Sequence, residues 1–174
     1  MSREVEIIMD AVDYYVSQWQ RERPDLDVSP MEVIGRLSRL AILVQERLDV
    51  VFADHGLQSW EFDVLATLRR AGQPYELSPG ELNRTMMITS GTTTHRISKL
   101  EQRGFVTRNT DETDRRVVRV RLTDHGRDVF DRCHAAHLTN EAHILELVTP
   151  ASRERLLAGL KALAEALGDK AAAR

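Results

Sequence analysis

Residues 89–122 read TSGTTTHRISKLEQRGFVTRNTDETDRRVVRVRL, and this stretch decides the fold. Its first part predicts a helix over residues 90–103, because Ile97 and Leu100 fall on one face and small or polar side chains fill the others. Gly104 follows at the position where a left-handed residue ends many helices. The stretch therefore opens with a short, hydroxyl-rich helix.

Two short strands follow this helix. Residues 105–107 read as the first strand, and residues 109–114 are polar and typical of a turn. Residues 118–122, VRVRL, alternate apolar and charged side chains with the period of a half-buried strand. The order helix, strand, charged loop, strand predicts a winged helix, which is a mostly α fold with a small β-hairpin.

The local charge of this stretch favours DNA as a partner. Eight basic residues stand against four acidic ones, whereas the whole chain has a formal net charge of -3. Small hydroxyl side chains allow close approach to bases and phosphates, and arginines at the hairpin tip suit the negative potential of a minor groove. The alternative is a solvated helix followed by an ordinary hairpin, because runs of charge often belong to plain surface.

The composition is that of an ordinary globular protein. Of 174 residues, 42% are hydrophobic and 29% are charged, and no apolar run approaches the ~20 residues that span a bilayer. The opening residues MSREVEIIMD do not resemble a secretion signal, and the single Cys133 excludes an internal disulfide framework. These features predict a cytoplasmic protein. The mild acidity argues against a general nucleic-acid coat protein but is compatible with a site-specific binder.

Helical patterns flank the stretch on both sides. We expect N-terminal helices within residues 1–56, a winged helix-turn-helix over 57–122 and C-terminal helices within 123–174. The terminal helices carry more apolar surface than the winged helix can cover, which predicts a second copy of the chain. A two-fold homodimer would present two recognition helices to a pseudo-palindromic operator.

Two segments together resemble the MarR (multiple-antibiotic-resistance-regulator) family of winged-helix repressors. They are ITSGTTTHRISKLEQRGFVTR at residues 88–108 and DETDRRVVRVRLTDHG at residues 111–126. The resemblance implies a transcriptional repressor that dimerises through interlocked terminal helices and responds to a small molecule. Motifs of enzymes are not found: the sequence has no glycine-rich phosphate loop, nucleophile elbow or HExxH helix.

Candidate DNA contacts follow from the chemistry of these segments. On the recognition helix and at the wing they are Ser90, Thr92, Thr93, His95, Lys99, Arg115 and Arg116. Asp114 is an alternative partner that would tie down one of the wing arginines, a structural role that the family pattern supports.

One subgroup of the family resembles the chain more closely, because it carries an extra N-terminal helix and senses urate or related purines. Its ligand pattern carries over to Trp19, Asp63, Arg96 and Arg108, although the link that follows Trp19 is shorter here. Urate is largely a monoanion at neutral pH, so arginine is a suitable bidentate partner and an indole can stack on the purine. We expect Asp63 to orient Arg96 in the free protein, and residues 1–56 to form a wall of the pocket.

Simpler roles remain open for these four residues. Trp19 could anchor a core or a dimer contact, Asp63 and Arg96 could form a structural ion pair, and Arg108 could contact phosphate. The effector could also be another phenol or carboxylate. The rival from a different class is a winged helix that binds protein, and the basic wing and hydroxyl-rich helix favour DNA over it.

One further helix raises the question of metal or redox sensing. Cys133, His134, His137 and His143 share it, with Cys133 and His137 at the spacing that places two ligands on one face. Two or three ligands without a clearly spaced carboxylate make a weak pattern, so a packed or surface helix is the simpler interpretation. No metal or cofactor is expected, and thiol sensing would require an exposed Cys133 of low pKa.

Overall fold

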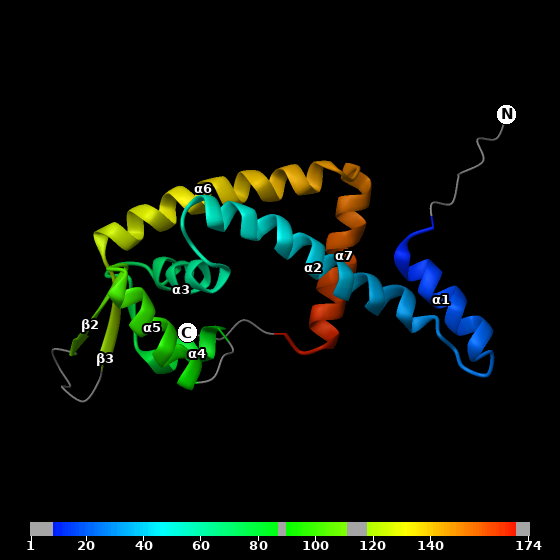
Figure 1. The fold of residues 1–174 in the computed structure, drawn as a ribbon, viewed down its shortest axis with the longest axis horizontal. Coiled ribbons are helices and arrows are strands. Elements are labelled where there is room, and N and C mark those ends of the chain that lie inside the picture. Colours follow the sequence, from blue (N-terminus) through cyan, green and yellow to red (C-terminus); the bar gives the residue numbers. More distant parts are fainter. Residues whose placement is uncertain (1–8, 87–89, 111–117, 170–174) are drawn as a thin grey trace. The chain divides into compact units, whose positions relative to one another are not determined.

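The computed structural model describes residues 9–86, 90–110 and 118–169, which divide into two compact units, residues 1–47 and 48–174. The first unit holds helix α1 (Ala11–Glu22) and most of α2 (Pro30–Asp54). The second holds the end of α2 and then α3 (Ser59–Arg70), β1 (Glu76–Leu77), α4 (Pro79–Met86), α5 (Ser90–Gln102), β2 (Val106–Thr110), β3 (Val118–Leu122), α6 (Asp124–Glu146) and α7 (Pro150–Ala166). The mostly helical fold with a small antiparallel sheet is confirmed (Figure 1).

The first unit is a pair of helices locked by one arginine. Asp10 caps α1 by accepting hydrogen bonds from the backbone N–H groups of Val12 and Asp13. Arg36 on α2 donates to both Asp10, at 2.8 Å, and Asp13. A Cβ atom on Gly35 would lie 3.2 Å from Val12, so the missing side chain allows the two helices to approach.

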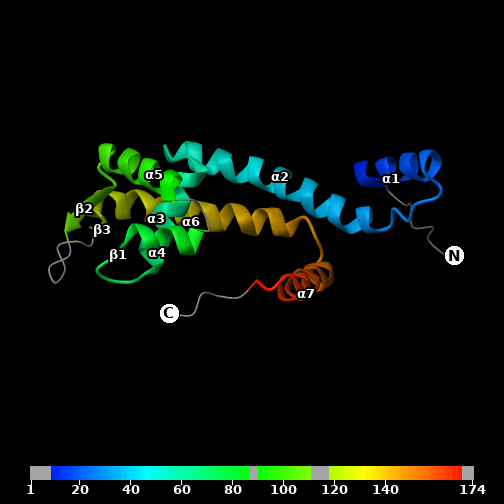
Figure 2. The same cartoon turned by 90° about the horizontal axis from the view of Figure 1, so that it is seen from below.

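The core of the second unit surrounds α3. Leu65 and Leu68 of α3 are fully buried, and so are Leu82 of α4, Leu100 of α5 and Val120 of β3. Figures 1 and 2 show α3, α4 and α5 gathered at the sheet, with the first turns of α6 beside them. Helix α3 contacts α4, α6 and β3, so this single helix organises the winged helix.

The sheet has the strand order β1-β3-β2, and both pairings are antiparallel. Strand β2 runs to Thr110 opposite Val118, so the first strand is longer than the sequence predicted and Asn109 belongs to it. Strand β1 was not predicted, because two residues carry too little alternation to reveal a strand. It adds a third strand to the expected hairpin.

The base of the wing is packed tightly where α5, β2 and α6 meet. Gly104 has φ 71° and ends α5, as predicted. Thr123 caps α6 by accepting from the N–H of Gly126 at 2.9 Å. A Cβ atom on Gly126 would lie 2.1 Å from the carbonyl oxygen of Phe105, so only glycine fits there.

The long helices expose much apolar surface. Every residue of α7 is described, and none is buried, although the helix carries a stripe of leucines. In both views α7 follows the end of α6 that lies away from the sheet (Figures 1 and 2). Exposed apolar side chains on α2 and α7 include Val33, Ile34, Leu37, Leu40, Leu43, Leu156, Leu157 and Leu160.

Within the described residues, no helix has the length and hydropathy that crossing a bilayer requires.

Candidate nucleic-acid interface

The first helix of the helix-turn-helix, α4, begins with a capping box. Glu81 accepts a hydrogen bond from the backbone N–H of Ser78 at 2.7 Å, and Ser78 accepts from the N–H of Glu81 at 3.3 Å. The bonds from Ser78 hold the pKa of the Glu81 carboxyl below its ordinary value. The same carboxylate pairs with Arg119 of β3 at 3.2 Å, so α4 is fixed to the sheet.

The recognition helix α5 has an inner and an outer face. Ile97 and Leu100 are buried, as predicted, and Thr92, His95 and Lys99 are exposed. Thr93, predicted to contact DNA, is instead 3% exposed, because it lies one turn before Ile97 on the inner face. Its hydroxyl is therefore not presented to a duplex in this conformation.

The remaining predicted contacts lie at or beyond the edge of the described chain. The side chain of Ser90 is not described, and Asp114, Arg115 and Arg116 at the wing tip lie outside the described residues. The strands that carry the tip are described, and their pairing ends at Thr110 and Val118. The structure therefore describes the two strands of the wing up to these residues.

Two of the predicted effector residues lie near each other between α3 and α5. Asp63 is on α3, and the positive charge of Arg96 on α5 reaches it. Surrounding protein atoms raise the pKa of the Asp63 carboxyl, although the residue keeps contact with solvent, and the charges of Arg96, Arg70 and His137 counter part of this shift. A carboxyl group of α3 and a guanidinium of α5 therefore lie close to each other.

The other two predicted effector residues have different surroundings. Arg108 on β2 pairs with Glu101 at 3.1 Å and donates to the hydroxyl of Ser98, so it is turned toward the outer part of α5. Trp19 lies on α1 in the first unit and is 49% exposed. The second unit therefore brings together Asp63 and Arg96, while Arg108 has partners of its own.

Comparison with known proteins identifies the family. Residues 55–117 match the model of the MarR family. Over 130 residues, which is 75% of this chain and 78% of the relative, the sequence is 48% identical to the HTH-type transcriptional regulator PecS of Dickeya dadantii. The chain belongs to the MarR family. It is therefore a DNA-binding regulator of transcription and not an enzyme.

Solved structures of MarR-family regulators share the fold. AbsC of Streptomyces coelicolor has a TM-score of 0.72 at 22% identity and covers 83% of this chain and 98% of its own. Sco3205 of the same organism, solved in complex with DNA, has a TM-score of 0.71 at 24% identity and covers 82% of this chain and 89% of its own. At these identities the likeness establishes the fold alone.

In this MarR-family chain, two contacts that join α3 to α5 and to the turn after α5 were missed from the sequence. The guanidinium carbon of Arg96 lies 5.6 Å from the ring centre of Trp60. Arg103 pairs with Glu61, which is 2% exposed, and donates to the carbonyl of Gly56 at 2.7 Å. The spacing of three between Trp60 and Asp63 places both on one face of a helix and was the available signal for Trp60.

Helix α6 of this regulator offers little chemistry for metal or redox sensing. Cys133 is fully buried, and burial raises the pKa of its thiol to about 11, so the nucleophilic thiolate is disfavoured at neutral pH. His137 pairs with Glu141 at 3.2 Å and packs on the rings of Phe52 and Phe62. Among the described residues, His, Cys, Asp and Glu side chains do not form a group of three or more that could hold a metal ion. These side chains behave as parts of a packed helix.

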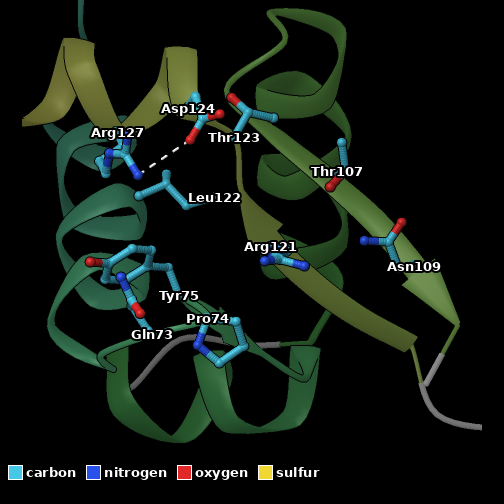
Figure 3. A pocket seen from close by; sticks show the side chains of 10 residues that line it. All are labelled: Gln73, Pro74, Tyr75, Thr107, Asn109, Arg121, Leu122, Thr123, Asp124 and Arg127. Atoms are coloured by element: carbon cyan, nitrogen blue, oxygen red, sulfur yellow. Dashed lines mark ion pairs between the residues drawn. The ribbon is translucent and has the colours of Figure 1, made fainter. Parts of the chain in front are cut away.

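A cavity of about 490 Å³ opens on the exposed side of the sheet (Figure 3). Its lining comes from the loop before β1, from β2 and β3, and from the first turn of α6, with Arg121 among the residues drawn there. Asp124 and Arg127 form an ion pair at 3.2 Å beside it. The described residues that were predicted to hold DNA or an effector do not line this cavity.

Proposed function

We propose that this MarR-family regulator is a homodimeric repressor that occupies a pseudo-palindromic operator and leaves it when a small aromatic anion, urate or a related purine, binds. The observation that carries the proposal is the position of Arg96. It belongs to the recognition helix, yet it lies over Trp60 and near Asp63 of α3. A ligand that competes for this arginine would act directly on the helix that reads DNA.

DNA binding is proposed to use the outer face of α5 and the wing. Thr92, His95 and Lys99 are the exposed candidates on α5. Ser90, Arg115 and Arg116 complete the set as sequence predictions. In a gel-shift series with the upstream region of its own gene, Arg116→Ala should weaken binding to all sequences and flatten the dependence on salt. An unchanged affinity would contradict the role of the wing.

Dimerisation is proposed to use the helices within residues 1–56 and 123–174, which flank the DNA-binding segment 57–122. Apolar side chains that are exposed on α2 and α7 of one chain supply the contact surface. Burying such surface against a second copy is the usual way in which a helical arm of this kind becomes ordered. Light scattering at micromolar concentration should give twice the mass of the chain, and a stable monomer would contradict the dimer.

Release from DNA is proposed to follow a population shift. In the free protein the aspartate and the indole of α3 orient Arg96 and, with it, α5. An anion that binds the guanidinium in the plane of its two N–H donors weakens that arrangement, so a conformation with poor fit to DNA becomes more populated. Trp19 and Arg108 are proposed to complete the pocket, as the resemblance to the urate-responsive subgroup implies.

The effector is tested on the preformed DNA complex. Urate, xanthine, hypoxanthine and salicylate are titrated at constant ionic strength, with potassium chloride as the control for plain salt effects. Urate or another purine should release the DNA at a lower concentration than salicylate does, and Trp19→Ala should need more purine. Release by none of the purines would overturn the purine proposal, and release by salicylate alone would replace it with a carboxylate effector.

A further inference from the structure

We infer that Trp60 is a ligand contact of this regulator, a fixed aromatic platform on which a planar heteroaromatic monoanion stacks while its anionic edge binds Arg96. The inference rests on the proposed function, because it assigns a further residue to the same effector site. Trp60, Arg96 and Asp63 all belong to the second unit, so the contacts argued below do not depend on how the first unit is placed.

The plane of the Trp60 ring is held from two sides. The ring packs partly against the hydrophobic core of the winged helix, and its indole N–H donates to the side-chain oxygen of Gln58. Gln58 is the residue that precedes α3, where its backbone N–H is held by Glu61 at 2.9 Å. An indole fixed in this way loses little conformational freedom when it receives a flat ligand.

The separation between Trp60 and Arg96 decides how such a ligand can bind. The distance of 5.6 Å from guanidinium carbon to ring centre is within the range of a cation–π contact. A planar ring inserted between two flat groups needs about 7 Å, since each stacked contact takes about 3.5 Å. The ligand therefore displaces the guanidinium from the face of the indole, and Arg96 binds the edge of the ligand instead. This change requires the side chain of Arg96 or α5 itself to move.

The charges around the platform select the class of ligand. Arg96, Arg70 and His137 all favour the ionised carboxylate of Asp63, so positive charge predominates around this one carboxylate. This balance favours a single negative charge on the ligand. The carboxylate of Asp63 accepts hydrogen bonds only, so it favours a ring N–H beside the anionic edge. Urate has both features, whereas benzoate has no ring N–H.

Two matched variants of Trp60 test the platform in the intact protein. Trp60→Leu removes the aromatic face, and Trp60→Phe keeps it. With urate as the probe, Trp60→Leu should raise the concentration that releases half of the DNA by about tenfold, and Trp60→Phe should restore most of the sensitivity. Affinity for urate is also measured on the DNA-free protein, where it should fall by a similar factor in Trp60→Leu and recover in Trp60→Phe, which separates loss of a ligand contact from a change in how α5 binds DNA.

A spectroscopic arm reports on the ring directly. The chain has two tryptophans, so Trp19→Phe leaves Trp60 as the single emitter. Its emission should fall saturably with urate, after correction for absorption by urate with N-acetyltryptophanamide, at the concentrations that release DNA from the same Trp19→Phe variant. The inference would be overturned, and the proposed function left intact, by either of two results. One is that Trp60→Leu releases DNA at the same urate concentration as the wild type. The other is that the emission of Trp60 does not fall while urate releases the DNA. Failure of urate and the other purines to release the wild type, together with unquenched Trp60, would overturn both.

Discussion

Helices α3 and α7 carry similar apolar patterns and have opposite surroundings. In α3, which has 12 residues, six are buried, and four of these, Phe62, Val64, Leu65 and Leu68, belong to the core of the winged helix. In α7, which has 17 residues, none is buried, and Leu157 is 53% exposed. The sequence pattern of both helices is amphipathic, but only the apolar face of α3 is buried by other elements of the described chain.

The difference shows which parts of the molecule can fold by themselves. The winged helix buries its own apolar face and satisfies its helix ends with Ser78, Glu81 and Thr123. Helix α7 has a good cap at Thr149, but none of its leucines is buried in one chain, so it gains little from the hydrophobic effect there. We therefore propose that the stability of α7 depends on a second copy of the chain, whereas the stability of the winged helix does not.

The largest effect is expected from Gly126→Ala at the base of the wing. The new Cβ atom would lie 2.1 Å from the carbonyl oxygen of Phe105, so the backbone has to move, at an expected loss of about 3 kcal/mol or more. Thermal unfolding should shift down by about 10 °C. Gly80→Ala in α4 is the control, because its Cβ would meet nothing within 4 Å, and it should be neutral or stabilising. Equal effects of the two changes would erase the contrast.

The next effect is expected from Leu157→Asp on α7. Two copies of an exposed leucine that becomes buried in a dimer contribute about 3 kcal/mol or more, so the dissociation constant should rise by about a hundredfold. Sedimentation over a concentration series measures this change, with Arg155→Gln on the same helix as the control. The monomer should keep the helical circular dichroism signal that the winged helix contributes. A dimer as tight as the wild type would show that α7 is covered in some other way.

A smaller effect is expected from Glu61→Gln within the winged helix. The change removes the charge from a 2% exposed carboxylate that pairs with Arg103, at an expected loss of about 1–2 kcal/mol in denaturant unfolding. Glu101→Gln is the matched control, because the pair of Glu101 with Arg108 is solvent-exposed and worth at most about 1 kcal/mol. A greater loss from the exposed pair would reverse the ranking of the two contacts.

The smallest effect is expected from Asp63→Asn, which should increase the stability of the fold. The pKa of Asp63 is raised in the folded state, so the ionised carboxylate disfavours folding at neutral pH. The variant should be slightly more stable at neutral pH, and its advantage should shrink as pH falls through the raised pKa toward the ordinary 3.8. Unfolding curves over this pH range measure it. A clear loss of stability at neutral pH would show that Asp63 serves the fold instead of a ligand.

Features within single elements were predicted well from the sequence. The apolar periodicity of residues 59–70 predicts the bounds of α3, and the spacing of Ser78 and Glu81 predicts the capping box of α4, because caps and periodicity act over a few neighbouring residues. Gly104 ends α5 for the same reason. The family resemblance in the recognition helix and wing is confirmed by the match over residues 55–117.

Features that depend on how elements pack were predicted less well. Thr93 was placed outside because its hydroxyl suggested DNA, although its spacing from Ile97 already placed it on the inner face. The contact between Trp60 and Arg96 joins residues far apart in sequence, and it depends on the crossing of α3 and α5. The turn of Arg108 toward Glu101 likewise depends on the position of β2 beside α5.

The ion pair of the buried Glu61 with Arg103, whose side chain is 41% exposed, makes the far end of α5 a pivot. The helix has 13 residues and is about 20 Å long, so it acts as a lever that is clamped at one end. A tilt of about 5° at the clamp carries the opposite end through about 1.7 Å, which is enough to break hydrogen bonds of about 3 Å to a base edge. A small displacement at Arg96, part-way along the lever, is thereby magnified where the helix begins.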